Sequence, residues 1–488
     1  MPALLAAALV FGTSGAVLVL EILAARLLAP YVGVTLETYT AIIGTVLAGI
    51  SIGHALGGRA ADRADPHTLL GPLLVAGGAL SLATIPLVRF VGSAGGADES
   101  RAVLLAGVGF FLPAAVLSAV SPVVVKTQLQ DLAVTGSVVG RLSAVGTAGS
   151  IVGTFLAGFV LVEVAATSTS IVVTGTLLVA AGVAAWGWGR TRRVGALGAL
   201  LLLAGAGTVT TFALDERCDA ETTYHCARIE ADRARAGGRT LVLDTLRHSY
   251  VDLDDPTHLE FRYVGNVADV IDALAPAGPI RAVHVGGGGF TLPRYVAATR
   301  PGSTNIVLEI DGGLVDVATD RLGLTAEPGL DVREGDGRRL LADVPDASID
   351  VVVGDAFGGL AVPWHLTTVE AVEEVGRVLR PGGLYVANLI DHPPLRFVRA
   401  ELATLAVAFP HVALLAPPST IDGRDGGNVV VVGSTAPIER SAVTAGLARR
   451  GTGETVLVDD EAMAFAGDAP VLTDDKAPVD QWLARSRR

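Results

Sequence analysis

Residues 282–296 read AVHVGGGGFTLPRYV, and this stretch decides the fold of the second half of the chain. A short apolar strand, Arg281–Val285, leads into it and a helix, Leu292–Thr299, leads out of it, so the glycines Gly286–Gly289 stand at a strand-to-helix junction. Glycine there lets the backbone turn tightly and approach a bulky ligand. A glycine run alone is equally compatible with a tight turn that binds nothing, so the neighbouring strands have to decide.

Short strands and helices alternate through the rest of this half, which is the pattern of βαβ units and a mostly parallel sheet. We also expect a turn at Pro381–Gly383, between a long helix and the next strand. The predicted strands are Arg281–Val285, Asn305–Ile310, Leu330–Arg333, Ile349–Gly354, Gly383–Ile390, His411–Leu415 and Asn428–Val432. The predicted helices are Gly265–Leu274, Leu292–Thr299, Gly313–Leu322, Thr367–Leu379 and Leu395–Phe409.

Acidic residues stand at the ends of the next three strands. Glu309 and Asp311 end the second strand, about 20 residues after the glycine run, where nucleotide-binding α/β folds hold ribose hydroxyls. Asp336 follows the third strand, in position to meet an adenine amino group, and Asp355 follows the fourth. Because ligands of open α/β sheets bind at the carboxyl ends of strands, the sequence predicts a ligand cleft there. The alternative is that these acids only cap the following helices.

A small antiparallel β unit precedes the α/β part. The stretches YHCARIEA, TLVLDTL and HSYVDL are typical of short strands, and RAGG is typical of the turn between the first two. We therefore expect three domains: a transmembrane helical domain over residues 1–214, the β unit over 215–263 and the α/β domain over 264–488.

The first 214 residues hold almost all of the long apolar runs. The whole chain has 51% hydrophobic and 17% charged residues and a mean hydropathy of +0.54, whereas soluble domains carry about 25% charged residues. Small residues such as Gly146, Gly149 and Gly153 let membrane helices pack closely. We expect an all-α, multi-pass membrane bundle of about seven spans, each of about 20 apolar residues. The spans are 3–29, 37–57, 69–92, 102–125, 142–162, 168–188 and 194–214.

Basic residues between the spans predict the orientation of the bundle. The loops after the second, fourth and sixth spans are richer in Lys and Arg than the other loops, and the positive-inside rule puts them in the cytoplasm. An odd number of spans then puts the α/β domain outside the cytoplasm, and one span more or fewer reverses this result. The richer set is Arg59, Arg63, Lys126, Arg141, Arg190, Arg192 and Arg193, and the poorer set is Arg89 and Arg101.

The two cysteines, Cys218 and Cys226, follow the last apolar run. They are candidates for a disulfide, which suits an extracytoplasmic location, and equally for two idle thiols. A structural zinc site wants four ligands and only His225 is near, so we expect no metal. The net charge of −13 argues against a nucleic-acid partner, which needs a basic face.

The motifs GGGG, EID, GDGR, DAF with VPWHLTT, and LRPGG, in that order, resemble the spermidine synthase family. That family has a small N-terminal β unit followed by a Rossmann-like methyltransferase fold. The membrane half, the form DAFGGLAVPWHLTTVEA and the C-terminal LTDDKAP resemble its bacterial integral-membrane branch of fused transporter-like/spermidine synthase proteins. The resemblance covers residues 215–488 by motif and the membrane half by architecture only.

The resemblance implies a site for decarboxylated S-adenosylmethionine or S-adenosylmethionine. The glycine turn would face the amino-acid part of this donor, Glu309 would hold the ribose hydroxyls and Asp336 would contact adenine. Asp355 would lie between donor and amine acceptor, where a carboxylate orients the amine and takes its proton. The expected cofactor-binding residues are Gly286, Gly287, Gly288, Gly289, Glu309, Asp311, Asp336 and Gly337.

Two or three acids of the family pattern are absent from this chain. The family's turn usually reads GGGDG, where this chain has Gly289, and its acidic loop usually reads DSSD or DSTD, where this chain has Asp355-Ala-Phe-Gly358. The membrane branch often has an acid where this chain has Leu360. Each lost charge-assisted contact costs about 1.5–3 kcal/mol, so these departures argue against true spermidine synthesis.

Asp355 and His365 are the catalytic candidates, because both belong to the motif loop and a histidine near carboxylates titrates near neutral pH. The alternative for each histidine is a surface or packing role. The expected substrate-binding residues are Tyr224, His248, Tyr250, Trp364 and Asp391.

Three functions compete at this stage. The first is a membrane-anchored, spermidine synthase-like transferase that uses an S-adenosyl-type donor for aminopropyl or methyl transfer, and it expects a cytoplasmic α/β domain because the donor is made there. The second is an extracytoplasmic enzyme on the same fold that acts on an envelope lipid or glycan without a nucleoside donor. The third is a non-enzymatic transport or sensor protein. The expected partners are membrane lipid and a small-molecule or envelope substrate, and the oligomeric state stays open, with a homodimer as one alternative.

Overall fold

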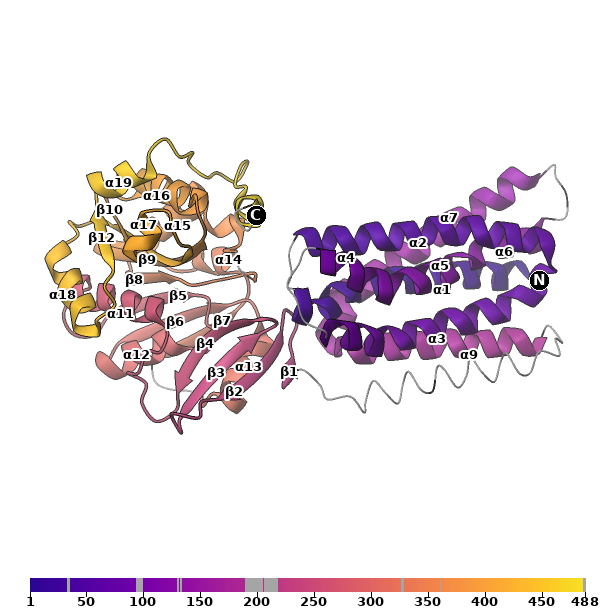
Figure 1. Ribbon diagram of the computed structural model, residues 1–488, viewed down its shortest axis with the longest axis horizontal. Coiled ribbons are helices and arrows are strands. Elements are labelled where there is room, and N and C mark those ends of the chain that lie inside the picture. Colours follow the sequence, from indigo (N-terminus) through magenta and orange to yellow (C-terminus); the bar gives the residue numbers. More distant parts are fainter. Residues whose placement is uncertain are drawn as a thin grey trace. The chain divides into compact units, whose positions relative to one another are not determined.

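A computed structural model of the chain describes residues 1–32, 36–93, 100–129, 131, 134–188, 205, 218–325, 329–359 and 361–485 (Figure 1). The chain divides into two compact units, Met1–Cys226 and Ala227–Arg488. The first unit is built from long helices and the second from strands and helices in alternation. This is the all-α bundle followed by an α/β fold that the sequence predicts.

Six stretches of the first unit form helices that are long and apolar enough to cross a membrane. They confirm the first six predicted spans, whereas the seventh, 194–214, lies outside the described residues except for Gly205. Two of the stretches contain a π-helical turn, η1 (Gly107–Phe111) and η3 (Ala157–Leu161). The helices are α1 (Ala3–Val32), α2 (Leu36–Arg63), α3 (Pro66–Ser93), α4 (Ser100–Ala106), α5 (Leu112–Ser118), α6 (Val120–Gln128), α7 (Thr135–Leu156), α8 (Val162–Val164) and α9 (Thr167–Trp188).

Helices α1 and α7 pack backbone to backbone through glycine. A Cβ atom at Gly149 would collide with the carbonyl oxygen of Phe11, and one at Gly153 would collide with that of Gly15. A Cβ atom at Gly146 would lie 3.2 Å from the Oγ atom of Ser14. Lipid supplies no hydrophobic drive between helices, so this close approach is what holds the pair together. The predicted packing role of the three glycines of α7 is confirmed.

Polar contacts identify two opposite ends of the helical unit. At one end, the Nε2 atom of Gln128, the last residue of α6, donates a hydrogen bond of 3.0 Å to the carbonyl oxygen of Met1. From α6 the chain runs along α7 to the other end, where Thr167 begins α9. There the backbone N–H of Thr167 donates a 3.1 Å hydrogen bond to the Oε2 atom of Glu221. Met1 and Glu221 therefore lie at opposite ends of the helices.

A small antiparallel sheet leads into the α/β part. Strand β2 (Cys226–Ala231) pairs with β3 (Gly238–Leu243), and β3 pairs with β4 (Leu246–Asp252). Just before it, Cys218 and Cys226 form a disulfide on either side of the two-residue strand β1 (Ala220–Glu221). Of the two alternatives left open by the sequence, the structure has the bonded pair.

An eight-stranded sheet of order β12-β10-β11-β9-β8-β5-β6-β7 forms the frame of the second unit. Strands β5 to β9 pair in parallel, and β11, β10 and β12 add antiparallel pairs at one edge. The strand order reverses at β5, between β6 and β8, and ligands of such sheets bind at this switch point. The strands are β5 (Arg281–Val285), β6 (Thr304–Glu309), β7 (Leu330–Glu334), β8 (Ile349–Gly354), β9 (Leu379–Asp391), β10 (His411–Ala416), β11 (Gly427–Ser434) and β12 (Thr455–Val458).

Helices cover both faces of this sheet, as Figure 1 shows. One hydrophobic core includes Val267 and Leu447, from α11 and α18, and another includes Val372 and Phe397, from α15 and α16. Strands between two such layers are buried on both sides, which is why β8 is an almost continuous apolar run. The helices are α11 (Arg262–Leu274), α12 (Thr291–Thr299), α13 (Gly312–Arg321), α14 (Gly337–Leu341), α15 (Val369–Val378), α16 (Arg396–Ala408), α17 (Pro418–Ile421), α18 (Arg440–Arg450), α19 (Asp460–Ala466) and α20 (Val479–Arg485), with a 3-10 turn, η4, at Trp364–Leu366.

The sequence places the long elements correctly and misses short ones. Each predicted strand and helix of the α/β part is present, with ends shifted by a few residues. The predicted turn at Pro381–Gly383 does not separate a helix from a strand, because these residues lie inside β9. They coincide with a register shift in the pairing of β9 with β8, where Gly382 has φ +83°. Helices α14, α17, α19 and α20 and strand β12 were not predicted, since stretches this short carry no full hydrophobic period. Helix α18, of 11 residues, was also missed, because its sequence RSAVTAGLARR has few large apolar residues.

Candidate active site

The glycine turn after β5 is shaped by its close neighbours. Gly286 has φ +96° and Gly288 has φ +50°, a region that favours glycine. A Cβ atom at Gly286 would collide with the carbonyl oxygen of Asp355, which follows β8. The turn therefore needs glycine both for its backbone conformation and for the approach of the neighbouring strand end.

Glu309 at the end of β6 holds this turn in place. Its Oε2 atom accepts hydrogen bonds from the backbone N–H groups of Gly287, at 2.8 Å, and Gly288, at 3.3 Å. Its Oε1 atom accepts one from the N–H of Asp311 at 3.0 Å. Glu309 is buried, and so is Asp311, the N-cap residue of α13. The structure thus brings Gly287, Gly288 and Glu309 together, with the carboxylate bound to the backbone of the turn.

Strand β4 of the small sheet covers the glycine turn from another direction. The Oγ atom of Ser249 accepts a 3.1 Å hydrogen bond from the N–H of Gly289 and lies 3.1 Å from the Nδ1 atom of His248. The hydroxyl of Thr291 donates to the carbonyl oxygen of Tyr250 at 2.9 Å. The sequence predicts His248 at this site and misses Ser249. The neighbouring His248 in the predicted strand was the available signal.

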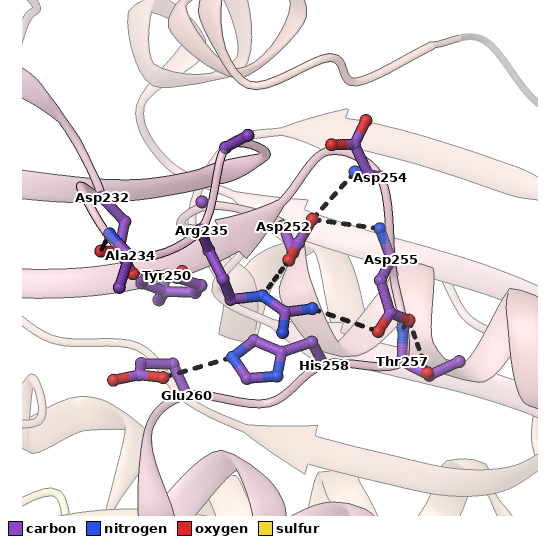
Figure 2. A network of polar contacts seen from close by, with 12 residues as sticks. Asp232, Ala234, Arg235, Tyr250, Asp252, Asp254, Asp255, Thr257, His258 and Glu260 are labelled. Atoms are coloured by element: carbon purple, nitrogen blue, oxygen red, sulfur yellow. Dashed lines mark hydrogen bonds and ion pairs between the residues drawn. The ribbon is translucent and has the colours of Figure 1, made fainter.

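The Tyr250 hydroxyl belongs to a polar network of the small sheet and the residues that follow it, shown in Figure 2. The hydroxyl donates to Asp232 at 2.8 Å, and burial raises the pKa of Tyr250 to about 12. In the same network Arg235 pairs with the carboxylates of Asp252 and Asp255. These contacts tie the turn between β2 and β3 to the end of β4. The Tyr250 hydroxyl is therefore engaged in holding the small sheet together.

Asp336 caps α14 and binds His365. Its Oδ1 atom accepts a 3.0 Å hydrogen bond from the N–H of Arg339, and its Oδ2 atom lies 2.8 Å from the Nε2 atom of His365. Burial opposes the ionisation of Asp336, but the bonds from Arg339 and His365 outweigh it and lower the pKa of the carboxyl. His365 is therefore bonded to Asp336, and Asp355, the other catalytic candidate, has different partners. The cap of α14 turns Asp336 toward the loop that carries His365.

The C-terminal LTDDKAP motif joins the same cluster. The guanidinium of Arg338 forms two bonds to Asp474, at 2.7 and 2.8 Å, and also donates to the carbonyl oxygen of His365 at 3.1 Å. The hydroxyl of Thr368 donates to Asp474 at 2.7 Å. Gly337 lies between Asp336 and Arg338 and lines a small apolar cavity of about 30 Å³. Sequence reasoning noted the motif but could not assign Asp474 a partner 136 positions away.

Asp355 is held by two side chains that the sequence did not single out. Asn388 of β9 donates its Nδ2 proton to Oδ1 at 2.9 Å, and the hydroxyl of Tyr263 on α11 donates to Oδ2 at 3.3 Å. The Oδ1 atom of Asn388 in turn accepts a 3.0 Å bond from Asn428. Burial raises the pKa of Asp355 to about 6, although both hydrogen bonds act to lower it. A carboxyl group with this pKa exchanges protons near neutral pH, as a general base must.

A cavity of about 490 Å³ opens beside Asp355. Tyr263 and Asn388, which both bind Asp355, are part of its lining, as are His248 and Asn428. A volume of this order accommodates a small-molecule ligand. The arrangement combines a rigid glycine turn, a carboxyl with a pKa near neutrality and an adjoining cavity.

The remaining predicted substrate-binding residues have other surroundings. Tyr224 belongs to the helical unit and is 44% exposed. Trp364 is 43% exposed and lies edge-on to His365, with ring centroids 5.9 Å apart. Asp391 is buried, accepts hydrogen bonds from the N–H groups of His392 and Val398, and has its pKa raised by burial. Its bonds fix the start of α16, which is a structural role.

Comparison with known proteins places this site in a family. A methyltransferase domain family matches residues 283–387. A probable spermidine synthase from Corynebacterium glutamicum has a similar structure, with 33% sequence identity and a TM-score of 0.50, over 53% of this chain and 97% of that one.

Curated relatives point in the same direction. A polyamine aminopropyltransferase from Chromobacterium violaceum is 28% identical over 29% of this chain and 53% of its own length. One from Halorhodospira halophila is 29% identical over 37% of this chain and 63% of its own length. The chain thus spans about half to two thirds of the length of these relatives. With its strand order, its glycine turn and the acids at successive strand ends, the α/β part of this chain belongs to a spermidine synthase-like family.

Proposed function

We propose that the chain is a membrane-anchored transferase that moves an aminopropyl or methyl group from an S-adenosyl-type donor to a nucleophile. The observation that carries the proposal is Asp355. This carboxyl has a pKa of about 6, contacts the glycine turn through its backbone and adjoins a large cavity through Tyr263 and Asn388. A donor at the turn and an acceptor in the cavity would meet at this side chain.

The residues at the strand ends suit an S-adenosyl-type donor. The glycine turn, in which a Cβ at Gly286 or Gly288 would meet other atoms closely, would pass along the amino-acid part of the donor. Glu309 would reach the ribose hydroxyls, and Asp336 and Gly337 would meet adenine. The donor supplies an activated carbon next to a positively charged sulfur. The acidic side chains of the chain would stabilise that positive charge and orient the carbon.

Asp355 would act as the base of the transfer. In that step a neutral nitrogen or oxygen of the acceptor forms a bond to the donor carbon, the carbon–sulfur bond breaks and a neutral thioether leaves. The acceptor loses one proton, and Asp355 takes it. Tyr263 and Asn388 position the carboxylate by their hydrogen bonds. Because its pKa is about 6, Asp355 is ionised and ready to accept a proton at neutral pH.

The product is expected to differ from spermidine. The motif loop offers one acid, Asp355, where the family usually has a second at the position of Gly358. Leu360, where the membrane branch often has an acid, lies outside the described residues. A diamine with two positive charges would therefore meet fewer acids in this loop than in the family, and each lost contact costs about 1.5–3 kcal/mol.

Calorimetric titration of the purified full-length chain with S-adenosylmethionine, its decarboxylated form and S-adenosylhomocysteine tests the proposal. At least one of these is expected to bind saturably, and Asp336→Ala is expected to weaken that binding about tenfold or more by removing a charged contact. The control is Asp343→Ala, at an exposed position outside the site. If none of the three compounds binds to the wild-type chain, the proposal is wrong.

A second candidate, an extracytoplasmic enzyme without a nucleoside donor, is favoured by the helical unit. Met1 and Glu221 lie at opposite ends of the helices, so the chain leaves this unit at the end opposite Met1. Lys126 and Asp62 pair near the Met1 end, which is rich in basic residues by sequence, and the positive-inside rule assigns that end to the cytoplasm. The disulfide Cys218–Cys226 suits the other side.

The sidedness of a tag fused after Arg488 separates the two candidates. A tag that an impermeant probe labels in intact cells would favour the second candidate, since the S-adenosyl donor is made in the cytoplasm. A tag protected in intact cells and reached after lysis would remove the second candidate. A maleimide probe for thiols, applied with and without reductant, would report on the disulfide in the same cells.

A further inference from the structure

Two side chains that line the cavity beside Asp355 each carry a buried oxygen atom that receives no hydrogen bond from the described residues: Oε2 of Glu454 and Oδ1 of Asn266. The Glu454 side chain is 1% exposed, and Asn266 is 4% exposed. The two side chains touch, because the Nδ2 atom of Asn266 donates to Oε1 of Glu454 at 3.2 Å. A buried acceptor without a donor is unfavourable, and both residues line the cavity of about 490 Å³.

The two oxygen atoms call for a ligand that donates hydrogen bonds and carries positive charge. A primary ammonium has three N–H donors and no acceptor, so it can serve a carboxylate and an amide oxygen together. Asn266 lies one turn of α11 beyond Tyr263, which binds Asp355. An ammonium group held by Asn266 and Glu454 would therefore sit in the same cavity as the proposed base, about one helical turn from it.

An arginine next to Glu454 indicates the second half of the ligand. The Nε atom of Arg262 lies 3.7 Å from Oε1 of Glu454, beyond hydrogen-bond distance, and its side chain is 59% exposed. Arg247 also lines the cavity, stacked over Phe261 at 5.4 Å. Among the described residues of the lining, the other acid is Glu260, which is exposed and pairs with His258 at 3.2 Å. The second ammonium group of a diamine would be repelled by the guanidinium groups of Arg262 and Arg247, whereas a carboxylate would be attracted to them.

We propose that the cavity binds the head group of an amino acid, with Glu454 and Asn266 on the α-ammonium and Arg262 on the α-carboxylate. A carboxylate and a guanidinium side by side match the two charges of such a head group. Only the identification of this amino acid as the acceptor rests on the proposed function. In that role the side chain of the amino acid extends toward Asp355. Glu454, which lies far from the family's motif loop in the sequence, then contributes to the choice of acceptor by binding its α-ammonium group.

Two probes that differ only in the carboxylate test the proposal. L-ornithine is putrescine with an added α-carboxylate, so calorimetric titration of the full-length chain with each compound isolates the contribution of that group. Ornithine is expected to bind at least about tenfold more tightly than putrescine, because it gains a charge-assisted contact. Equal binding, tighter binding of putrescine, or no binding of either compound would overturn the proposal.

Three variants assign the residues. Glu454→Gln keeps the size of the side chain and is expected to weaken ornithine binding about tenfold or more. Arg262→Ala, at an exposed side chain, is expected to weaken ornithine binding and leave putrescine binding unchanged or stronger. Glu373→Gln, exposed on α15, is the matched control. Wild-type affinity of either cavity variant for ornithine would refute the assignment.

A parallel titration with S-adenosylmethionine keeps this proposal distinct from the proposed function. If ornithine binds and no S-adenosyl compound does, the head-group site stands and the transferase proposal falls. If an S-adenosyl compound binds and ornithine binds neither alone nor after it, the head-group site falls and the transferase proposal stands.

Discussion

Glu309 and Glu454 are both buried carboxylates of the α/β unit, and they differ in how their oxygen atoms are used. Glu309 accepts three backbone N–H groups, from Gly287, Gly288 and Asp311. Glu454 accepts one side-chain N–H, from Asn266, and its Oε2 atom receives none from the described residues. The donor side of the proposed site is therefore complete without a ligand, whereas the acceptor side leaves hydrogen-bonding capacity for one.

This difference indicates that the donor side and the acceptor side of the proposed site have different roles. A carboxylate that accepts three backbone N–H groups fixes the shape of a turn before a ligand arrives, which is preorganisation. A carboxylate with a free oxygen is a local destabilisation that a cationic ligand relieves. Asp355 lies between the two, with both oxygen atoms bonded and a pKa near neutrality.

The largest effect is expected for Asp355→Asn. The amide cannot take a proton, and loss of a general base lowers turnover by about 10²–10⁴-fold. With an S-adenosyl donor and an amine acceptor, the rate of thioether release by wild-type protein should rise as pH increases through about 6 and then level off. Asp343→Asn, at an exposed acid, is the control. A variant at position 355 that keeps more than a tenth of the wild-type rate would mean that Asp355 is not the base.

The second effect concerns folding and separates Glu309 from an ordinary acid. Glu309→Ala leaves three backbone N–H groups without an acceptor, and at about 1 kcal/mol each the free energy of unfolding should fall by about 3 kcal/mol. The urea midpoint of the full-length chain in detergent, followed by tryptophan fluorescence, measures this loss. Glu373→Ala on the exposed face of α15 should stay within about 0.5 kcal/mol of wild type. An equal loss in both variants would remove the special role of Glu309.

The donor side could be predicted from sequence because its determinants are local. Glycine after an apolar strand and an acid at the next strand end reflect backbone geometry that recurs in parallel sheets. Gly286 directly follows β5 and Glu309 is the last residue of β6, so their places in the chain fix their places in the sheet. The expectation that Glu309 holds a ribose stays a prediction, but its meeting with the glycine turn follows from strand order alone.

The acceptor side could not be predicted, because its contacts join distant parts of the chain. Asn266 and Glu454 are separated by 188 positions, and Asn388 reaches Asp355 from a neighbouring strand. Glu454 follows α18, a helix that was not predicted, and it belongs to no recognisable sequence motif. His365 shows the converse error. It stands near Asp355 in the sequence, yet the cap of α14 gives it Asp336 as its partner.

The third prediction turns the raised pKa of Asp355 into a stability measurement. Because the folded chain holds this proton more tightly than the unfolded chain, with a pKa of about 6 against 3.8, the stability it contributes is present below pH 3.8 and is lost as pH rises through about 6. Asp355→Asn removes this loss, so at pH 8 the variant should be about 1–3 kcal/mol more stable than wild type. At pH 4 the two should be similar. Urea midpoints at both pH values give the comparison, and an equal difference at pH 4 and pH 8 would contradict it.

The smallest effect on the free energy of unfolding is expected for Glu454→Gln. Burial raises the pKa of the Glu454 carboxyl, so the charged form is disfavoured in the folded chain. Glutamine keeps an oxygen for Asn266 and removes the buried charge, and such exchanges are often neutral or stabilising. The free energy of unfolding without ligand should change by less than about 1 kcal/mol or rise slightly.

The matched variant Glu309→Gln is the comparison for the small effect expected of Glu454→Gln. There the amide nitrogen would face one of the three backbone N–H groups that the carboxylate now accepts, so the free energy of unfolding should fall by about 1–3 kcal/mol. Equal destabilisation by the two glutamines would show that Glu454 is a structural carboxylate like Glu309, with its charge satisfied in the folded chain. A clear difference between the two losses of stability would indicate separate roles: Glu309 stabilises the glycine turn, and Glu454 binds a cationic ligand.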